Sequence, residues 1–475
     1  MASPDRTPGA GPAAGAPGSL VSALRAIVGE AHVLVRPEQL LAYECDGLTH
    51  HTGLPSAVVL PAEKGAVARV VRACNAHAVP FVPRGAGTGL SGGALALGGG
   101  VVIECSRMNK ILELDPDDGV AVIQPGVVNA DLSKAAAPHG LFYAPDPSSQ
   151  QACTIGGNVA ENSGGPHTLK YGTTTNHVLA LELVTADGEL VRLGSRTGFA
   201  PGYDLVGAVV GSEGTLGVVT KIVLKLQPHP TQTLLMLVPF RSAESACAAV
   251  AAIFQAGVTP SGLEFMERNA IDWAVRYVGE TPVPIQETDA AHLLIEVDGF
   301  HLESLYADCE TITRVLENYD CGEIFFADND ATKTSLWKLR RNVGHAVKHN
   351  SVYKEEDTVV PRAELPFLLK KVKEVGAKYG FESVCYGHAG DGNLHVNILK
   401  GQLDDHTWNV EVPKGIREIF KFVKSKGGTI SGEHGIGLVQ RPYLDIVFSK
   451  TELRLMRQIK KAFDPRGILN PGKAI

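Results

Sequence analysis

The chain has 475 residues, of which 44% are hydrophobic and 20% are charged, and its formal net charge is -7. This composition is that of a globular protein, and the length predicts more than one domain. The negative charge argues against nucleic-acid binding, which needs a basic face. The eight cysteines form no C-x-x-C pair. We therefore expect no iron–sulfur cluster or zinc ribbon from this chain alone, and a reducing compartment.

Residues 1–18 are rich in Ala, Gly and Pro and are predicted to be a disordered tail. The sequence after them has neither the apolar core of a signal peptide nor an apolar run long enough to span a membrane. We expect a cytoplasmic protein. Peripheral contact with the inner face of a membrane stays open.

A βαβ unit is predicted near the start of the folded part. A helix over 20–33 precedes a strand over 56–60, a helix over 64–78 and a strand over 80–83. Apolar residues at i, i+3, i+4 and i+7 from Val67 support the second helix. The second strand leads into a glycine-rich loop, residues 83–93.

This loop matches two motifs by letters alone. Residues 87–92 fit the dinucleotide fingerprint G-x-G-x-x-G, and residues 89–93 fit the nucleophile elbow G-x-S-x-G. Both motifs require a helix to begin at the glycines. Here a strand is expected over 101–104, with no room for a useful helix before it. We interpret the loop as a nest of backbone N–H groups for an anion such as a diphosphate. The alternative is a merely flexible loop.

Three more loops of small residues follow, over 146–158, 162–165 and 211–217. Regular elements are predicted between and after them, namely strands over 120–124, 178–185 and 190–193, a helix over 129–138 and a long strand ending near 226. Ala186-Asp187-Gly188-Glu189 indicates a hairpin turn. Four loops on one β-rich scaffold favour one long, extended cofactor.

The chain changes character after residue 230. Predicted strands over 234–238 and 293–297 alternate with helices over 243–254 and 302–318. This alternation is typical of a ferredoxin-like α+β domain. We therefore expect a domain boundary near residue 230.

A second group of polar residues lies far down the chain. Two apolar runs flank Gly390-Asp391-Gly392-Asn393, which predicts a β-hairpin. His388 should close its first strand and His395 should open its second, so that the two imidazoles can meet. Asn397 should share a face with His395. Together with Glu433 from Ser431-Gly432-Glu433-His434-Gly435, the histidines predict a divalent-metal site. The alternative is a set of solvated turn residues.

The loops and the C-terminal motifs together, including Ile468-Leu469-Asn470-Pro471-Gly472-Lys473, resemble the FAD-linked D-2-hydroxy-acid dehydrogenases of the vanillyl-alcohol-oxidase superfamily. Members include glycolate oxidase flavoprotein subunits, D-lactate dehydrogenases and D-2-hydroxyglutarate dehydrogenases. The resemblance covers residues 35–475 and implies an α+β fold. A PCMH-type FAD-binding domain is expected over 19–230, and a ferredoxin-like cap that contributes the substrate pocket over 231–475.

The resemblance also implies which residues bind FAD. These are Pro83, Arg84, Gly85, Ala86, Gly87, Thr88, Gly89, Leu90, Pro147, Ser148, Cys153, Thr154, Gly156, Gly157, Asn158, Asn162, Ser163, Gly164, Gly165, Glu213, Gly214, Gly217, Val218, Val219 and Asn470. Covalent members of the superfamily often carry histidine where this chain has Thr88. We therefore expect FAD to be held without a covalent bond.

For the activity, the resemblance implies oxidation of a small D-2-hydroxy acid, D-lactate or glycolate, to the 2-oxo acid by hydride transfer to FAD N5. Arg340 and Lys354 are expected to bind the substrate carboxylate, which suits a guanidinium fork. The alternative for both is a solvated surface charge.

The same resemblance implies the remaining site roles. His388, His395 and Glu433 are expected to hold a divalent metal, zinc in the first place, that polarises the 2-hydroxyl. His434 is expected to be the base that removes the hydroxyl proton. Asn397 is expected to hydrogen-bond the substrate or a metal ligand.

Several alternatives remain open at this stage. The substrate could be D-2-hydroxyglutarate, or the chain could be a flavin-binding subunit of a multi-subunit glycolate oxidase. Aldonolactone oxidation on the same scaffold and a metal hydrolase are weaker alternatives, the last because H-E-x-x-H is absent. The expected electron acceptor is a quinone, a cytochrome, an electron-transfer flavoprotein or an iron–sulfur subunit. A homodimer is among the expected assemblies.

Overall fold

The computed structural model describes residues 15–48, 51–199, 201–279, 285–327 and 329–475. Backbone packing divides the chain into two units. The first comprises Met1–Gly164, Gly172–His229 and Glu433–Ile475, and the second comprises Gly165–Tyr171 and Pro230–Gly432. The chain thus passes into the second unit at Pro230 and returns to the first unit at Glu433. The prediction of one boundary near residue 230 did not include this return.

The described part of the first unit begins with a helix at the end of the segment that was expected to be a tail. Residues 1–14 of that tail lie outside the described residues, but α1 (Gly18–Val28) already starts at Gly18. This helix is shorter than predicted because Gly29 follows it with φ 89°, a conformation that suits glycine and ends the helix.

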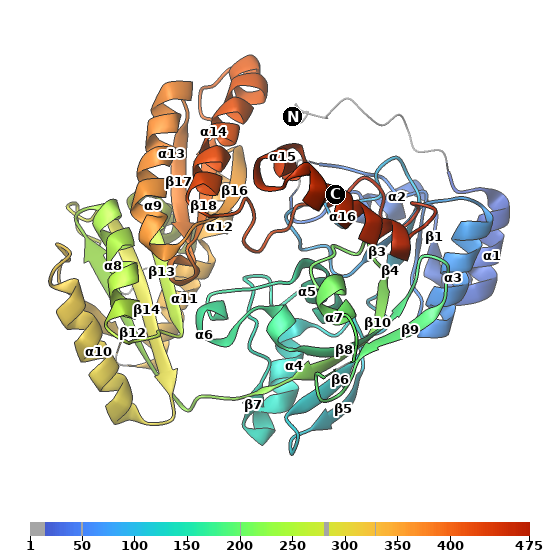
Figure 1. Ribbon diagram of the computed structural model, residues 1–475, viewed down its shortest axis with the longest axis horizontal. Helices are drawn as coiled ribbons and strands as arrows, with labels where there is room; N and C mark the ends of the chain where they lie inside the picture. Colours follow the sequence, from blue (N-terminus) through green and yellow to red (C-terminus); the bar gives the residue numbers. More distant parts are fainter. Residues whose placement is uncertain (1–14, 49–50, 200, 280–284, 328) are drawn as a thin grey trace. The chain divides into compact units, whose positions relative to one another are not determined.

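A four-stranded sheet with the order β1-β2-β4-β3 follows (Figure 1). Its strands are β1 (Val33–Leu34), β2 (Ala57–Val59), β3 (Phe81–Arg84) and β4 (Val101–Glu104). Both β2 and β3 run parallel to β4, and α3 (Lys64–Ala76) connects them, so the predicted βαβ unit is confirmed. Apolar residues of α1, α3 and these strands share one core.

A five-stranded sheet forms most of the remaining β scaffold in this unit, with the order β5-β6-β10-β8-β9, beside a two-stranded sheet of β11 and β7. Its strands are β5 (Ile111–Asp115), β6 (Val120–Ile123), β8 (Val178–Val184), β9 (Leu190–Gly194) and β10 (Val218–Lys225). The predicted hairpin between β8 and β9 is confirmed, with the N–H of Thr185 donating to the carbonyl of Glu189.

The remaining elements of the first unit are short or C-terminal. They are α2 (Pro37–Leu40), α4 (Asn129–Ala136), β7 (Leu141–Phe142), α5 (Ile155–Glu161), α7 (Leu205–Val209), β11 (Gln227–Pro228), α15 (Leu444–Val447) and α16 (Lys450–Phe463). The C-terminal segment is tied to the first sheet, because Phe81 and Leu469 form a parallel bridge.

The second unit is built on a seven-stranded sheet with the order β15-β12-β14-β13-β17-β18-β16 (Figure 1). Its first part runs β12 (Gln232–Phe240), α8 (Ala243–Gln255), β13 (Gly262–Glu267), β14 (Ala291–Gly299), α10 (Leu302–Leu316) and β15 (Phe325–Ala327). α9 (Arg268–Val278) lies between β13 and β14, as an addition to the βαββαβ sequence of a ferredoxin-like fold with antiparallel neighbours. The α+β class is confirmed.

Three strands extend this sheet: β16 (Tyr353–Val359), β17 (Glu382–Gly387) and β18 (Asn393–Leu399). The predicted hairpin joins β17 and β18, but its details differ from the prediction. His388 lies just beyond the end of β17, and His395 is the third residue of β18, opposite Tyr386.

Helices cover both faces of this sheet. α9 (Arg268–Val278), α11 (Asp330–Arg341) and α12 (Val343–Asn350) pack on the face that carries Leu237, Met266 and Leu294. α8 packs with α10 and with α13 (Leu365–Tyr379), and α13 packs with α14 (Val412–Ser425), away from that core. The short α6 (Thr168–Tyr171) joins this unit through Lys170, which pairs with Asp298. Among the described residues, no helix is long and apolar enough to cross a membrane.

Candidate active site

The glycine-rich loop of the first unit, residues 83–93, is distinguished by its backbone N–H groups. Within the described part of the chain, none of the backbone N–H groups of residues 86–91 donates a hydrogen bond. No helix begins in this loop, which confirms that neither the dinucleotide fingerprint nor the nucleophile elbow applies. Unused N–H groups need a partner, and a run of them makes an anion-binding concavity. The loop therefore fits the diphosphate of a flavin dinucleotide.

The side chain of Arg84 packs beneath the backbone of this loop, at Gly87. Its guanidinium donates to the carbonyls of Cys45, at 2.8 Å, and Tyr43, and lies over the Tyr43 ring. Gly87 has φ 70°, and a Cβ there would collide with the Arg84 guanidinium. This packing explains why glycine stands at 87. It gives Arg84 a structural task beside any contact with a bound anion.

Two other predicted FAD residues, Thr154 and Gly214, lie against residues of this loop. Thr154 caps α5 and crowds Gly85, while Gly214 lies against Pro83. The stretch from Cys153 to Asn158, predicted as a loop, is therefore the cap and first turn of a helix. The assignment of individual residues to FAD, among them Pro147, Ser148, Val218 and Val219, stays a prediction.

Three non-glycine residues of the predicted cofactor set have left-handed backbone. Asn162, Glu213 and Asn470 have φ of 54°, 53° and 45°. Such conformations are unfavourable for side-chain-bearing residues and persist where the surroundings enforce them, often at functional sites. The side chain of Asn470 donates to the carbonyls of Gly93 and Glu213, which fastens two of the loops together.

Buried charged side chains lie beside the same loops. Glu213 accepts the N–H groups of Ile436 and Gly437 at 2.7 and 2.6 Å, and Lys473 donates to the carbonyl of Gly93. Burial raises the pKa of Glu213, and burial with the neighbouring Glu213 raises that of Glu161 well above its ordinary value. Neither Lys473, which was noted only as part of the C-terminal motif, nor Glu161 was predicted to belong to this network.

In the second unit the polar residues share one face of the sheet. Register partners lie on the same face of paired strands, and Met266 faces Tyr386, Tyr386 faces His395, and His395 faces Asp357. Asn397 faces Glu355 in the same way. This row crosses β13, β17, β18 and β16. We refer to it, with Glu264 two residues before Met266, as the polar sheet face.

Glu264 is the centre of this polar sheet face. Its carboxylate is fully buried and lies 2.6 Å from Nη2 of Arg340 on α11 and 2.8 Å from Nδ1 of His388. The structure thus joins the predicted carboxylate anchor to a predicted metal ligand through one acid. A carboxylate on Nδ1 of a histidine fixes the ring and leaves Nε2 for a ligand.

Arg340 itself is 4% exposed and lies with its guanidinium over the Tyr386 ring. Its Nε is buried and makes no hydrogen bond to any described residue. A buried guanidinium with an unused donor matches what is needed to bind a carboxylate.

The two histidines of the hairpin come together as expected. Their ring centroids are 5.6 Å apart, and a nitrogen of each lies within 4.8 Å of one of the other. Nδ1 of His395 lies 3.7 Å from carboxylate oxygens of both Glu355 and Asp357. Such a donor set suits a divalent metal ion.

Asn397 and Tyr386 complete this face. Asn397 is fully buried, and neither atom of its amide makes a hydrogen bond of good distance and angle, although it lies near the Tyr386 hydroxyl. Burial, together with Glu355, raises the pKa of Tyr386 well above its usual range. The phenol therefore stays protonated and can donate towards Glu355, 3.4 Å away.

Asp357 fixes the start of the segment that carries Glu433 and His434. Its carboxylate accepts the Gly432 N–H at 2.7 Å, the Ser431 hydroxyl at 3.1 Å and the Asn393 amide at 2.6 Å. Glu433 follows Gly432 directly, so its backbone starts from this anchored residue. Glu433 and His434 are half-buried residues outside regular structure, and their roles stay predictions.

Lys354 is the predicted site residue that the structure separates from the others. It alternates with Glu355 on β16 and faces Ile398, so it points to the opposite face of the sheet. Its ammonium lies 4.6 Å from the centre of the Trp408 ring. The expectation that Lys354 joins Arg340 at the substrate carboxylate is wrong for this arrangement.

Sequence reasoning missed Glu264, Glu355 and Asp357. Glu264 lies in a strand whose other residues from Gly262 to Met266 are buried and mostly apolar. An acid at such a position must be paired. An acid within an apolar strand was therefore the signal in the sequence. The partners of Glu264, on α11 and after β17, are far away in sequence.

Comparisons with known proteins agree with this geometry. A family model described as "FAD linked oxidases, C-terminal domain" matches residues 229–474, and one described as "FAD binding domain" matches residues 55–194. Glycolate oxidase subunit GlcD of Escherichia coli strain K12 is 40% identical, covering 96% of this chain and 91% of that protein. D-lactate dehydrogenase of Anaerostipes hadrus is 36% identical, covering 88% and 89%. D-2-hydroxyglutarate dehydrogenase of Stutzerimonas stutzeri is 35% identical, covering 96% and 98%.

Solved structures share the fold. p-Cresol methylhydroxylase with substrate bound superimposes with a TM-score of 0.78 at 19% identity, covering 96% of each chain. Alkyldihydroxyacetonephosphate synthase gives a TM-score of 0.74 at 20% identity, covering 96% of this chain and 86% of that one. With the predicted PCMH-type and cap domains confirmed, the chain belongs to the FAD-linked oxidase family and uses FAD.

Proposed function

We propose that this protein oxidises a small D-2-hydroxy acid, D-lactate or glycolate, to the corresponding 2-oxo acid. The observation that carries the proposal is the Glu264 bridge, which holds Arg340 at 2.6 Å and His388 at 2.8 Å on one sheet face. The names of the relatives, a glycolate oxidase subunit and a D-lactate dehydrogenase, support the same substrate class. FAD, when bound, supplies the hydride acceptor at N5.

Arg340 would bind the substrate carboxylate through its unused donor, and Asn397, whose amide is buried without good hydrogen bonds, would bind the substrate oxygens. Two anchors fix the orientation of the acid, so that only one hydrogen on C2 can leave as hydride. The hydroxyl proton would pass to His434. Loss of the hydride and the proton forms the C=O bond and reduces the flavin by two electrons.

His388, His395 and Glu433 would hold a divalent metal, zinc in the first place. The fixed Nδ1 of His388 and the close approach of the two rings support this assignment. Such an ion, when bound, lowers the pKa of a hydroxyl that it contacts. Glu264 would orient His388, and Asp357 would hold the Ser431–Gly432 backbone from which Glu433 follows.

The charges on the polar sheet face favour a substrate with one carboxylate. Glu264, Glu355 and Asp357 are acidic, and Lys354 points to the other face. Lys170 lies on the same unit but is already paired with Asp298. Among the described residues of this face, no lysine or arginine besides Arg340 stands by for a second carboxylate, as in D-2-hydroxyglutarate, and an unpaired buried charge is costly.

The remaining proposals concern the cofactor and the partners. FAD would be non-covalent, since Thr88 offers no histidine for a bond. Electrons would leave to a quinone, a cytochrome, an electron-transfer flavoprotein or an iron–sulfur subunit, since the eight cysteines show no cluster spacing. A cytoplasmic location with contact to the inner face of the membrane would suit such acceptors.

The test is dye reduction by the purified flavoprotein with a panel of D-2-hydroxy acids and their L enantiomers. We expect D-lactate or glycolate to give the highest kcat/KM, and removal of metal by a chelator to abolish turnover while the flavin absorbance stays. A higher kcat/KM with D-2-hydroxyglutarate would refute the single-carboxylate proposal. Full turnover after metal removal would refute the metal role.

A further inference from the structure

The hydroxyl of Tyr386 lies on the polar sheet face but takes no part in the proposed oxidation. Tyr386 is 6% exposed, and its hydroxyl makes one hydrogen bond within the described residues, 3.4 Å long, to Glu355. An O–H···O hydrogen bond is usually about 2.7–2.8 Å long. Buried tyrosine hydroxyls normally have a good partner. The hydroxyl of Tyr386 is therefore suited to exchange this long bond for a shorter one to a bound molecule.

The ring of Tyr386 is held on several sides. The Arg340 guanidinium lies over it, 5.2 Å from the ring centre, and the His395 ring lies beside it with centroids 5.2 Å apart. Apolar side chains of α12, among them Val343 and Val347, belong to the same core. A ring that is fixed in this way directs its hydroxyl to one place. That place is close to the Asn397 amide.

Gly344 on α12 leaves room for this hydroxyl. A Cβ at residue 344 would lie 3.1 Å from the Tyr386 hydroxyl oxygen, which is closer than ordinary van der Waals contact. Gly344 lies within the helix and has no positive φ, so its backbone does not require glycine. Within a helix, glycine is less favourable than alanine. The space that the hydroxyl occupies is therefore the reason for a glycine here.

Three polar groups without good partners thus meet around one ring. Nε of Arg340 and the amide of Asn397 make no hydrogen bond of good geometry to described residues, and Tyr386 makes only the long one. Each of the three can donate a hydrogen bond. The carboxylate of a 2-hydroxy acid accepts only, and its two oxygens have about four acceptor sites. One carboxylate can therefore accept from all three groups.

We propose that Tyr386 is a third contact for the substrate carboxylate, beside Arg340 and Asn397. When the acid binds, the hydroxyl turns from Glu355 to a carboxylate oxygen. The contact is a neutral donor, so it adds no charge to the polar sheet face. Because every candidate acid has this carboxylate, the contact strengthens binding without selecting among the acids. The inference rests on the proposed function, which makes the substrate a 2-hydroxy acid.

Tyr386→Phe tests the inference, because it removes the hydroxyl and keeps the ring beneath Arg340. We expect kcat/KM to fall roughly tenfold for D-lactate and for glycolate alike, mainly through KM, because the lost hydrogen bond is to a charged group. The dissociation constant of pyruvate, read from the flavin spectrum, should rise by the same factor. The FAD content and the metal content should remain those of wild type.

Gly344→Ala tests the same contact from the helix side. The added Cβ crowds the hydroxyl, so kcat/KM should fall about threefold or more, while the melting temperature should not fall, because alanine is the better helix former. Added to Tyr386→Phe, Gly344→Ala should cause little further loss, since the crowded hydroxyl is gone. A purely structural role of Gly344 would instead lower the melting temperature in both backgrounds.

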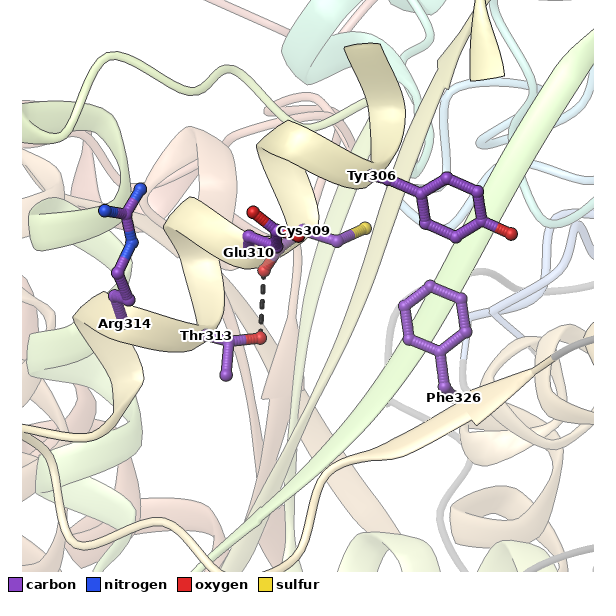
Figure 2. A pocket seen from close by; sticks show the side chains of 6 residues that line it. All are labelled: Tyr306, Cys309, Glu310, Thr313, Arg314 and Phe326. Atoms are coloured by element: carbon purple, nitrogen blue, oxygen red, sulfur yellow. Dashed lines mark hydrogen bonds between the residues drawn. The ribbon is translucent and has the colours of Figure 1, made fainter. Parts of the chain in front are cut away.

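Tyr306→Phe is the control for the loss of a tyrosine hydroxyl. Tyr306 lies in an exposed hollow of about 600 Å³ between α10 and β15, where Figure 2 shows it stacked on Phe326 with ring centroids 6.4 Å apart. None of the residues that line this hollow belongs to the polar sheet face. The variant should keep the kcat/KM of wild type with both acids.

The outcomes separate this inference from the proposed function. Unchanged kcat/KM in Tyr386→Phe overturns the inference and leaves the proposed function standing. A fall that differs between D-lactate and glycolate overturns it as well, because the hydroxyl would then lie beside C3 and not at the carboxylate. A fall that comes with loss of FAD or metal shows that the hydroxyl holds the fold, and overturns it too. A wild type that oxidises no 2-hydroxy acid overturns the proposed function and this inference together.

Discussion

The glycine-rich loop of the first unit and the polar sheet face of the second unit present different chemistry to a ligand. In the loop, the six successive backbone N–H groups from 86 to 91 donate to none of the described residues, and the side chains around them serve to shape the backbone. On the polar sheet face the backbone groups are used in strand pairing. The polar groups without hydrogen bonds to described residues belong to side chains such as Arg340 and Asn397. The first arrangement suits an anionic cofactor of fixed shape. The second can discriminate a small substrate.

One buried glutamate in each region expresses this difference. Glu213 accepts two backbone N–H groups, so it fixes the path of the chain. Glu264 forms an ion pair with a guanidinium and a hydrogen bond with an imidazole, so it fixes the orientation of reacting side chains. The same residue type should therefore give different phenotypes in the two places.

The largest effect is expected for Glu264→Gln. The amide keeps the size but leaves the buried Arg340 without its counter-charge and His388 without a carboxylate. Loss of such a supporting contact costs about 10- to 100-fold for one ligand, and two groups are affected here. We expect kcat/KM to fall by about 100-fold or more, with metal content reduced and FAD content unchanged.

The matched control for Glu264→Gln is Glu267→Gln on the same strand. Glu267 pairs with Lys373 and accepts the N–H of Cys385, away from the histidines. Its substitution should change the melting temperature more than kcat/KM. Equal losses of kcat/KM in both variants would mean that Glu264 only supports the fold.

Arg340→Lys should have the next largest effect. Lysine keeps the charge but loses the fork and the Nε donor, and a charge-assisted hydrogen bond is worth about 1.5–3 kcal/mol. We expect kcat/KM to fall roughly tenfold to a hundredfold, with FAD retained. Arg341→Lys, at a neighbouring position where the guanidinium lies over the Trp337 ring, is the control and should be close to wild type. Unchanged kinetics in Arg340→Lys would remove it from the substrate site.

His292 gives a contrast to His388, since both are buried histidines beside an acid. His292 lies on β14 near Asp289, and burial lowers its pKa to about 4. The unfolded chain protonates this histidine near pH 6.5, so it binds more protons than the folded chain between pH 4 and pH 6.5. Stability from this group therefore rises with pH across that window, by on the order of 1–3 kcal/mol.

Removal of His292 should flatten this pH dependence. Urea unfolding of wild type and His292→Gln from pH 4 to pH 7 measures it, and the difference between the two curves isolates the one group. Turnover at neutral pH should be unaffected, since the residue has no part in the site. A pH-independent difference in stability would contradict the lowered pKa.

Glu213→Gln tests the loop side of the comparison. The amide can accept one backbone N–H but not both with full charge, so the segment at Ile436 and Gly437 should loosen. We expect the FAD dissociation constant to rise about tenfold, as measured by flavin release on dilution. KM for the hydroxy acid in the FAD-saturated variant should stay within about threefold of wild type. A change in KM alone would place Glu213 with the substrate residues.

The sequence predicted this molecule unevenly, and the reason is physical. The glycine loop at 83–93, the βαβ unit and the ferredoxin-like alternation are local patterns, and each appears where it was predicted, whereas part of the loop predicted over 146–158 is the first turn of α5. The hairpin of β17 and β18 was predicted, but its strand ends differ. Gly392 and a short turn at Ala389–Asp391 place His388 outside the strand. Glu264 and Asp357 could not be assigned, since their partners come from α11 and from residues 431–432, and only the fold brings these together.

Lys354 shows the complementary error, in which a residue of the right type lies beside the site in sequence but not in space. On a strand, neighbours point to opposite faces, and the faces here are fixed by pairing of Glu355 with Asn397 and of Lys354 with Ile398. Lys354→Ala should therefore change kcat/KM by no more than about threefold, while the loss of its cation–π contact with Trp408 costs about 0.5–1 kcal/mol of stability. Steady-state kinetics and thermal unfolding of Lys354→Ala and Arg340→Lys side by side measure both effects. A loss of kcat/KM as large as that of Arg340→Lys would mean that Lys354 reaches the substrate carboxylate after all, and that the face seen here is not the one used in turnover.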